Sequence, residues 1–487
     1  MNLVEVLLAR GVGDAPALVD PLGATTYAEL AAVTGRLGGL LVERGVEPGD
    51  RVAIASGNDR AFVAAYLGVL HVGAIAVPLN PSAPPGELTR QLSAVEPRLA
   101  LAAGPARAML SASGAEVVAV DLDALDASSA ARVERADHDV AVLLFTSGTA
   151  GAPKAAMLTH GNLASNIHQV LDHPGLTLRP DDRTLGVLPF HHVFGLNVSL
   201  GVTLAAGGVV VLEDHFDAAP CLDLIRRAGV SVIAGVPTMY AAWLALDRSS
   251  APNDAFASVR LAVSGAAPLS DETAADFHRR FGVVVHQGYG LTEAAPIVTT
   301  TAVDDRDPHA GSIGPPLPGV EVRVVDADGS DVLAGDPGEV WVRGPNVFPG
   351  YWHDQEATTR VLTGDGWLRT GDVAVVEDGE LRLVDRAKDL VIVSGFNVYP
   401  VEVEDVLRAL EGVRDTAVIG EPHPRTGETV VAYVEAEPGQ ALDPEALRGA
   451  CAKSLARYKC PSRIEIVDEL PRTHAGKLVR RDLKETG

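Results

Sequence analysis

The sequence contains few cysteines and few aromatic residues. Its 487 residues include three cysteines, and Phe, Trp and Tyr together make up 5% of the chain. Cys221, Cys451 and Cys460 are too few and too scattered for a disulfide framework, and none of them forms a CxxC pair. The first residues also lack a basic segment followed by an apolar one, so no signal peptide is predicted. We therefore expect a reduced, cytoplasmic protein.

Long hydrophobic runs and excess positive charge are also absent. The most apolar tract, residues 62–79, is interrupted by Gly68, His71, Gly73 and Pro78, whereas a spanning helix needs about 20 apolar residues. The formal net charge of -24 opposes binding to nucleic acid or to an anionic membrane. We expect small-molecule partners, no integral membrane segment, and a monomer or a homodimer.

Lysine is scarce where arginine is common. Only six of the 40 basic residues are lysines: Lys154, Lys388, Lys453, Lys459, Lys477 and Lys484. Lysine is a compact point charge that suits polyanions, so a lysine kept against this bias is a candidate for binding or catalysis.

The pattern along the chain indicates an α/β protein of two domains. Helical stretches alternate with short β-rich runs through the first 300 residues, which predicts two wound α/β units. After about residue 310, short strands separated by Gly, Pro and Asp predict a small barrel-like β region. A new α+β pattern begins near residue 400. We place an N-terminal domain at 1–386 and a small C-terminal domain at 387–487.

A loop rich in Ser and Gly follows the apolar run at 141–145. It reads FTSGTAGAPK and ends at Lys154. Hydroxyls and glycine amides in such a loop can wrap a phosphate chain, and the lysine adds charge. The loop is not a Walker motif, because Pro153 stands where that pattern needs glycine. Taken alone, a flexible turn is an equally good interpretation.

A second cluster combines SGAAP at 264–268 with HQGYGLTE at 286–293. Its glycines let a planar ring approach the backbone, and Tyr289 offers a stacking face. Glu293 is a candidate magnesium ligand between phosphates. The alternative is a turn with a capping Thr and Glu.

Two further motifs lie in the last third of the chain. TGD at 370–372 ends on Asp372, whose carboxylate suits ribose hydroxyls, although TGD is more often a hairpin turn. PRTHAGK at 471–477 ends on Lys477, which Gly476 leaves free to swing onto a polyanionic centre; an exposed tail lysine is the alternative.

The order and spacing of these motifs resemble the adenylate-forming superfamily, which includes acyl-CoA synthetases, nonribosomal-peptide adenylation domains and beetle luciferases. The resemblance runs from about Thr26 to Leu483 and is nearest to fatty-acid or aryl-acid CoA ligases. It implies ATP and acyl sites in the large domain and a catalytic lysine on a mobile small domain.

The resemblance also implies roles for single residues. The phosphate loop matches Thr146, Ser147, Gly148, Thr149 and Lys154. The nucleotide segments match Ser264, Gly265, Ala266, Gln287, Gly288, Tyr289 and Gly290, with Thr292 on the α-phosphate and Glu293 on magnesium. Asp372 matches the ribose-binding acid and Arg386 an arginine that supports the nucleotide. Ala150 and Ala155 depart from the family pattern, so one phosphate contact is in doubt.

Other matches concern the two half-reactions. Lys477 resembles the catalytic lysine of adenylation, and Lys388 the hinge of the small domain. Ser394 and Gly395 match a loop that lines the thiol tunnel after rotation, together with Phe396. His192 matches the histidine beside the acyl pocket; a core histidine is the alternative, and His191 is the weaker candidate.

The implied reaction uses ATP, Mg²⁺ and coenzyme A. An acid is converted to acyl-AMP and pyrophosphate, and the acyl group then passes to a thiol with release of AMP. Lys453 and Lys459 are candidates for the coenzyme A phosphates, with solvated surface lysines as the alternative.

The acyl substrate is expected to be apolar. Residues 186–212, which would form a wall of the acyl pocket, contain no Asp, Glu, Lys or Arg. We expect a medium- or long-chain fatty acid. The alternatives are an aryl acid of the cinnamate or coumarate type and, in another class, a catalytically silent acyl or nucleotide binder.

Overall fold

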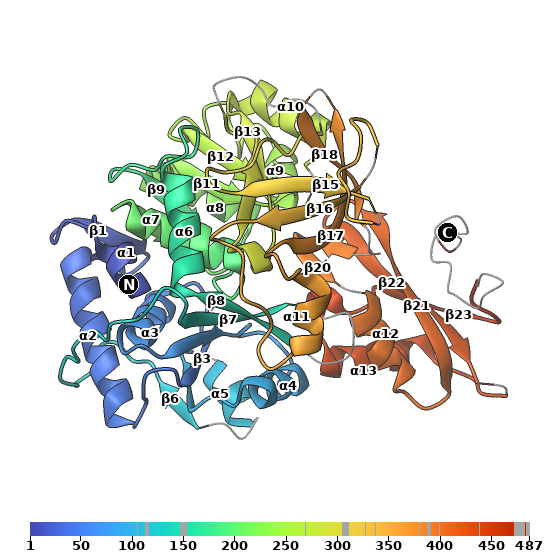
Figure 1. Cartoon of the computed structure of the whole chain (residues 1–487), viewed down its shortest axis with the longest axis horizontal. Coiled ribbons are helices and arrows are strands. Elements are labelled where there is room, and N and C mark those ends of the chain that lie inside the picture. The colour runs from blue at the N-terminus through green and yellow to red at the C-terminus, as the bar shows by residue number, and fades with distance from the viewer. Residues whose placement is uncertain are drawn as a thin grey trace.

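The fold is built from four β-sheets with helices packed between and around them (Figure 1). In this computed structural model the described residues are 1–104, 106–112, 116–146, 153–267, 269–303, 311–326, 328–336, 338–377, 379–386, 391–398, 400–437, 439–471 and 483. The first two sheets are mainly parallel, the third is antiparallel, and the fourth belongs to a small C-terminal unit. The α/β prediction is confirmed.

The first sheet has the strand order β6-β5-β3-β4-β7-β8. Its strands are β3 (Arg51–Ala55), β4 (Ile75–Pro78), β5 (Leu99–Ala102), β6 (Val117–Ala119), β7 (Val140–Thr146) and β8 (Lys154–Thr159). The surrounding helices are α2 (Tyr27–Glu43), α3 (Arg60–His71), α4 (Pro85–Val95) and α5 (Ala106–Ala112). β8 runs antiparallel to β7, so the phosphate-loop segment connects these two strands.

The second sheet has the order β14-β13-β12-β11-β9-β10-β1-β2. Its strands are β1 (Pro16–Asp20), β2 (Gly23–Thr26), β9 (Arg183–Gly186), β10 (Val209–Leu212), β11 (Val232–Gly235), β12 (Leu261–Ser264), β13 (Val285–Gly290) and β14 (Ile297–Thr300). Its helices are α6 (His160–Leu171), η1 (Phe194–Val202), α7 (Thr203–Ala205), α8 (Ala218–Ala228), α9 (Pro237–Leu244), α10 (Asp271–Phe281) and η2 (Thr292–Ala294).

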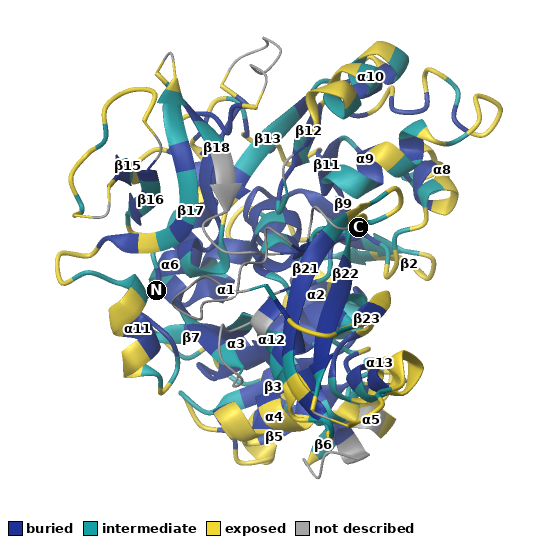
Figure 2. Cartoon of the chain, turned by 90° about the vertical axis from the view of Figure 1, so that its right-hand side faces the viewer, coloured by how far each residue is buried: buried dark blue, intermediate teal, exposed yellow. Residues whose placement is uncertain are grey.

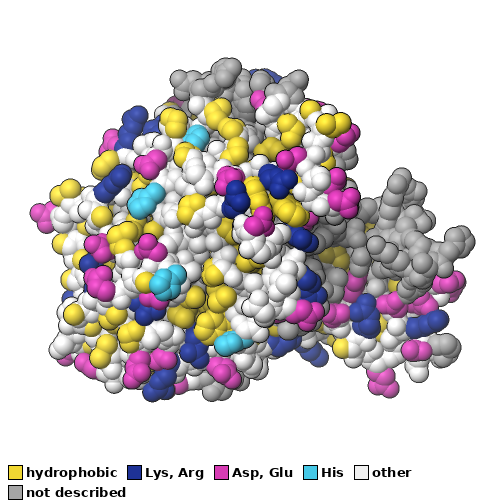
Figure 3. All heavy atoms as spheres, viewed as in Figure 1, with side chains coloured by type: hydrophobic (Ala, Val, Ile, Leu, Met, Phe, Trp, Pro, Cys, Tyr) yellow, Lys and Arg dark blue, Asp and Glu magenta, His cyan; other side chains and the backbone are white. Residues whose placement is uncertain are grey.

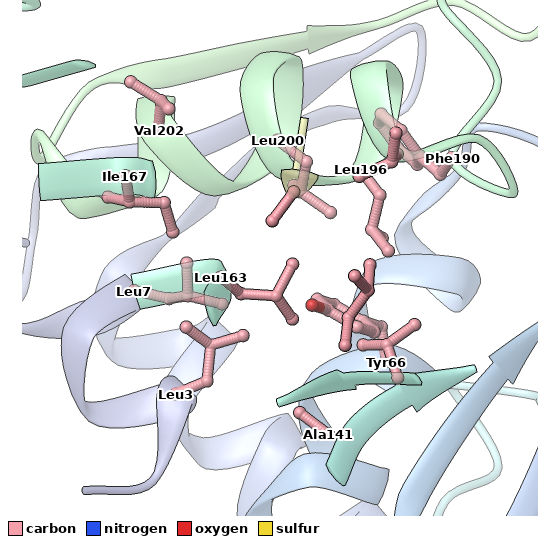
Figure 4. Packing of buried hydrophobic residues seen from close by; sticks show 14 of the residues in the cluster. Leu3, Leu7, Tyr66, Ala141, Leu163, Ile167, Phe190, Leu196, Leu200 and Val202 are labelled. Carbon is pink, nitrogen blue, oxygen red and sulfur yellow. The ribbon is translucent and has the colours of Figure 1, made fainter. Parts of the chain in front are cut away.

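A single apolar core joins the two sheets. Leu3 and Leu7 of α1 (Leu3–Leu8) meet Leu163 and Ile167 of α6 and Leu200 of η1, as Figure 4 shows. All of these side chains are buried. Burying such a side chain contributes about 1.5–3 kcal/mol, so this core fixes the relative position of elements that are far apart in sequence.

The tract 62–79 illustrates how local sequence sets the elements. Asp59 caps α3 by accepting a hydrogen bond from the Phe62 backbone N–H. Gly73 follows the helix with φ +75°, a conformation that glycine adopts without strain, and β4 begins at Ile75. The tract therefore divides into a helix and a strand, as predicted.

The third sheet has the order β15-β16-β17-β18 and is antiparallel. Its strands are β15 (Glu321–Val325), β16 (Gly338–Arg343), β17 (Leu368–Glu377) and β18 (Glu380–Arg386), and α11 (Gln355–Val361) lies between β16 and β17 in sequence. The TGD motif lies inside β17, so its interpretation as a hairpin turn is wrong.

The small C-terminal unit has one mixed sheet. It consists of β19 (Val391–Val393), β20 (Phe396–Val398), α12 (Pro400–Arg408), β21 (Val413–His423), β22 (Gly427–Ala436), α13 (Pro444–Ser454), η3 (Arg457–Lys459) and β23 (Arg463–Val467). Val418 and Val430 face a cluster with the helices, while Ile419 and Tyr433 face the other side with Leu470. Both faces are covered, and Figure 2 shows β21 and β22 buried along much of their length.

The surface carries charges of both signs. On the face in Figure 3, Lys and Arg side chains alternate with Asp and Glu among the described residues. Within those residues, no helix is both long enough and apolar enough to cross a bilayer.

Candidate active site

One cavity lies between the N-terminal sheets and the small C-terminal unit. Its volume is about 550 Å³, within the usual range for small-molecule sites. Residues from both sides line it. The site residues predicted from sequence that line it are Thr146, His192, Gly265, Ala266, Gly288, Tyr289, Gly290, Thr292, Glu293, Ser394 and Gly395. Segments more than 200 residues apart in sequence thus meet at one cavity.

Tyr289 and Asp372 connect the second and third sheets. The Tyr289 hydroxyl donates a hydrogen bond of 2.8 Å to the Asp372 carboxylate. Gly371, with φ +73°, interrupts the regular strand just before Asp372, and its N–H donates to Glu339 Oε1. This irregular backbone directs the carboxylate toward β13. Arg386 lies opposite Asp372 in the β17–β18 register; its side chain is outside the described parts.

Glu293 belongs to a second polar group. The Tyr351 hydroxyl donates a 2.6 Å hydrogen bond to Glu293 Oε1, and Lys154 Nζ lies 5.5 Å from the centre of the Tyr351 ring. Sequence reasoning missed Tyr351, because one tyrosine after a Pro-Gly pair carries no charge or spacing signal. Tyr351 is nearly buried, so it holds the Glu293 carboxylate in place.

The donor set at Glu293 fits magnesium. Among the described residues, no group of three His, Cys, Asp or Glu side chains forms a metal cage. Magnesium usually binds through one or two carboxylates and the phosphates of a nucleotide, keeping several waters. A single oriented carboxylate beside a cavity matches that mode.

Ser264 and Gln287 lie behind the cavity wall. They face each other in the register of β12 and β13. Gln287 Oε1 accepts from the Leu269 N–H at 3.1 Å, and so holds the segment after Ser264 against β13. The Ser264 hydroxyl is buried. These two residues support the wall rather than line it.

Two histidine rings face the cavity. The His191 and His192 centroids are 4.5 Å apart, and both residues line the cavity. Burial, with the Lys459 charge nearby, lowers the pKa of His192 to about 4. His192 is therefore neutral near pH 7, and no hydrogen bond to its Nε2 is found within the described residues. A neutral ring that lines the cavity suits contact with an uncharged acyl group.

A loop of the small unit closes the cavity next to these histidines. The centre of the Phe396 ring lies 5.1 Å from the centre of the His192 ring. It stacks on the Tyr458 ring with 4.6 Å between the two ring centres. Gly395 has φ +83°, and a Cβ there would lie 2.7 Å from Val236 Cγ1. Any larger residue would push the loop off the N-terminal wall. Tyr458 was also missed from sequence.

The apolar end of the cavity is formed by Phe194, Val236, Val263 and Ile297. Phe194 begins η1, a π-helix, and its ring covers Gly265: a Cβ on Gly265 would lie 3.1 Å from Phe194 Cε1. π-Helical turns are often found at functional sites. Of these four residues only Phe194 belongs to the segment 186–212, which also contributes Leu188 and Val193 to the cavity; that this segment contacts an acyl group stays a prediction.

Lys459 lies elsewhere than expected. It is buried, it forms ion pairs with Glu87 and Glu402, and with them it lines the cavity, so it is not a surface lysine; a contact with the coenzyme A phosphates stays a prediction. Sequence spacing could not reveal this, because Glu87 lies 372 residues away in sequence. Lys453 is exposed, as one alternative predicted.

Five predicted site residues lie outside the described parts: Ser147, Gly148, Thr149, Lys388 and Lys477. Their roles, and the domain boundary at 386/387, remain predictions.

Comparison with known proteins gives a consistent assignment. Residues 8–352 match the model of the AMP-binding enzyme family, and residues 402–477 match the AMP-binding enzyme C-terminal domain. The chain is 38% identical over 474 residues to a feruloyl-CoA synthase of Amycolatopsis sp, covering 95% of the chain and 94% of that protein. It is 34% identical to a long-chain-fatty-acid–CoA ligase of Yersinia pestis, covering 99% and 94%.

Solved structures agree over the whole length. Apo MatB from Rhodopseudomonas palustris is 36% identical with a TM-score of 0.74, covering 100% of this chain and 98% of that one. A double mutant of o-succinylbenzoate CoA synthetase (MenE) from Bacillus subtilis, bound with its product analogue OSB-NCoA, is 29% identical with a TM-score of 0.90, covering 99% and 98%. By its sequence, its fold and the residues that meet at its cavity, the chain belongs to the AMP-binding enzyme family.

Proposed function

We propose that the chain activates an aromatic acid of hydroxycinnamate size, one with no charge besides its carboxylate, and transfers the acyl group to coenzyme A. The chain is an AMP-forming acid–thiol ligase that uses ATP and coenzyme A. The observation that carries the finer proposal is the cavity itself. The nucleotide residues, an apolar end and the 394–396 loop share about 550 Å³.

The size of the cavity favours a compact acid. The acyl group would share this cavity with the nucleotide and with the thiol of coenzyme A, so only part of the cavity is left for the acid. The apolar end is limited by the Phe194 ring over Gly265, and an aromatic ring can stack against that face. The 38% identity to a feruloyl-CoA synthase supports the same class.

A medium- or long-chain fatty acid is the second candidate. The uncharged lining with Val236, Val263 and Ile297 favours it, since aliphatic chains need no polar partner. The 34% identity to a long-chain-fatty-acid–CoA ligase points the same way. A dicarboxylic acid is disfavoured, because among the described residues the apolar group Phe194, Val236, Val263 and Ile297 includes no cation for a second carboxylate, and the cavity's Lys459 is already paired with Glu87 and Glu402.

The first step is in-line transfer to the acid. A carboxylate oxygen of the acid attacks the α-phosphorus of ATP, and the bond to pyrophosphate breaks. Two anions must approach each other, so positive charge is required. Lys154, Thr292 and Lys477 would supply charge and hydrogen bonds to the phosphates, and Asp372 would hold the ribose. Magnesium held by Glu293 would screen the phosphate charge.

The second step needs a different segment of the small unit to face the same acyl group. The thiol sulfur of coenzyme A loses its proton to solvent and attacks the acyl carbonyl carbon; the bond from that carbon to the phosphate oxygen breaks, and AMP leaves with its electron pair. Ser394, Gly395 and Phe396 would guide the thiol past His192, whose neutral ring leaves the carbonyl undisturbed. Rotation near Lys388 would exchange this loop for Lys477 between steps.

The test is ATP–pyrophosphate exchange over a panel of acids. The panel contains hydroxycinnamic acids, benzoic acids, fatty acids of rising chain length and malonic acid. We expect hydroxycinnamic acids to give the highest kcat/KM. If kcat/KM were highest with fatty acids, the second candidate would replace the proposal. If none of the acids supported exchange, a catalytically silent binder would be supported instead. Lys477→Ala should lose exchange yet still convert supplied acyl-adenylate to thioester.

A further inference from the structure

Three charged side chains form a buried cluster where the small unit meets the N-terminal part. Lys459 Nζ lies 2.9 Å from Glu402 Oε1 and 3.3 Å from Glu87 Oε1. The side chains of Lys459 and Glu87 are each 8% exposed, and that of Glu402 is 21% exposed. We call these three residues the interface charge cluster. Surface ion pairs contribute little, but a buried pair is sensitive to the loss of either partner.

The cluster joins two parts of the chain that are far apart in sequence. Glu87 belongs to α4 beside the first sheet, whereas Glu402 begins α12 and Lys459 ends η3 in the small unit. The second oxygen of Glu87 accepts from the Ala456 N–H at 3.0 Å. Both carboxylate oxygens of Glu87 are therefore bound to the small unit.

Only the docked arrangement satisfies all three groups. If the small unit rotated away, Lys459 would keep Glu402, which belongs to the same unit, but Glu87 would lose both of its cross-boundary partners. Burial raises the pKa of Glu402; burial also opposes the charge of Lys459, but Tyr458 and the carboxylates of Glu402 and Glu87 outweigh it and raise the pKa of the lysine. The cluster thus favours one position of the small unit and does nothing for others.

The cluster is coupled to the cavity through two rings. Tyr458 precedes Lys459 in η3, and its ring stacks on Phe396, which lies 5.1 Å from His192. Fixing Lys459 against α4 therefore fixes Tyr458, and Tyr458 supports Phe396. Arg90 of α4 adds a 2.8 Å hydrogen bond to the Ser454 carbonyl at the same boundary.

We propose that Glu87 and Lys459 are positioning residues for the thioester-forming step: their buried ion pair holds the small unit against α4 and thereby holds Phe396 and Tyr458 beside His192. This rests on the ligase activity but not on which acid is used. The proposal gives neither residue a part in adenylation, because Glu87 loses its contacts with Lys459 and Ala456 once the small unit leaves α4.

The test separates the two half-reactions in Glu87→Gln. Pyrophosphate exchange reports adenylation, and conversion of supplied acyl-adenylate and coenzyme A to thioester reports the second step. We expect thioester formation to fall by about tenfold or more, because the ion pair across the boundary is lost while Lys459 keeps Glu402 within the small unit. Exchange should stay within about twofold. Glu356→Gln, on exposed α11, is the matched control and should change neither rate.

Two outcomes overturn the proposal. The first is unchanged thioester formation, and the second is an equal fall of both half-reactions in a folded variant, which would indicate a merely structural role. If Glu87→Gln does not fold, Glu87→Asp is tested instead, since it keeps the charge and only shortens the side chain. The ratio of thioester formation to pyrophosphate exchange should again fall. Lys459→Arg, which keeps the positive charge, should retain more thioester formation than Lys459→Met, which removes it.

Small-angle X-ray scattering tests the docking role without relying on enzyme activity, so failure of this proposal can be told apart from failure of the proposed function. If no acid in the panel supports pyrophosphate exchange by the wild-type chain, the proposed function fails, whatever role the interface charge cluster has. The cluster would still be tested, because Glu87→Gln should increase the radius of gyration and the maximum dimension relative to wild type. Identical scattering curves would overturn the docking role.

Discussion

The Tyr289 hydroxyl donates a 2.8 Å hydrogen bond to the Asp372 carboxylate and so joins β13 to β17 at a tyrosine that lines the cavity. Hydrogen bonds to a charged group contribute about 1.5–3 kcal/mol. We expect Tyr289→Phe to raise the KM for ATP by roughly tenfold, because Asp372 loses the group that orients it. Steady-state kinetics at varied ATP checks this. Tyr27→Phe, which removes a buried hydroxyl far from the cavity, should lower stability without changing that KM.

Tyr351 gives a second prediction, for the magnesium side of the site. Its hydroxyl donates to Glu293 over 2.6 Å, and a residue that orients a metal ligand commonly affects metal affinity by about 10–100-fold when mutated. We expect Tyr351→Phe to raise the magnesium concentration needed for half-maximal pyrophosphate exchange by about tenfold. Saturating magnesium should restore most of the rate. A loss that magnesium does not restore would contradict this role for Tyr351.

Eleven of the site residues predicted from sequence line the cavity, but the sequence did not show how they are connected. The glycine-rich segments, Asp372 and Glu293 carry spacing and charge that a linear motif records. Tyr351, Tyr458 and Glu87 carry none, because their importance comes from contacts across 58, 62 and 372 residues respectively. Local patterns also predicted α3, β4 and α12 well, since caps and glycines act within a few residues. The π-helix at Phe194 has no such local signal.

Gly395 and Gly449 form a matched pair for the same substitution. Gly395 has φ +83°, and a Cβ there would lie 2.7 Å from Val236 Cγ1, whereas a Cβ on Gly449 in α13 meets nothing within 4 Å. Gly449→Ala should raise the free energy of unfolding by about 0.5–1 kcal/mol. Gly395→Ala should slow thioester formation from supplied acyl-adenylate while sparing pyrophosphate exchange. An equal loss in both half-reactions would contradict the placement of this loop.

Stability should fall as the solution becomes acidic, in part because of His160. This buried ring accepts a hydrogen bond from the Leu3 N–H, and burial lowers its pKa to about 4 from the ordinary 6.5. Below pH 6.5 the unfolded chain binds a proton that the folded chain does not, so unfolding becomes easier until the pH reaches about 4. The contribution at pH 5 is about 2 kcal/mol.

His160→Gln tests this pH dependence. Glutamine can accept from the Leu3 N–H but does not titrate. Urea unfolding at pH 7 and pH 5 should show a smaller loss of stability on acidification in the variant than in wild type. His138→Gln, at an exposed site, controls for the substitution itself. An equal loss in variant and wild type would mean that His160 does not titrate as described.

Gly265 sets the space available to the acyl group, since a Cβ there would lie 3.1 Å from Cε1 and 3.2 Å from Cζ of Phe194. Such contacts are tighter than normal packing, so Gly265→Ala must displace the Phe194 ring, which lines the cavity. We expect kcat/KM to fall by about tenfold or more for hydroxycinnamic acids and less for short aliphatic acids, because overpacking penalises the bulkier group. A panel of acids in the exchange assay measures this ratio. A uniform loss across all acids would place the defect in nucleotide binding, and Phe194 would then have no part in choosing the substrate.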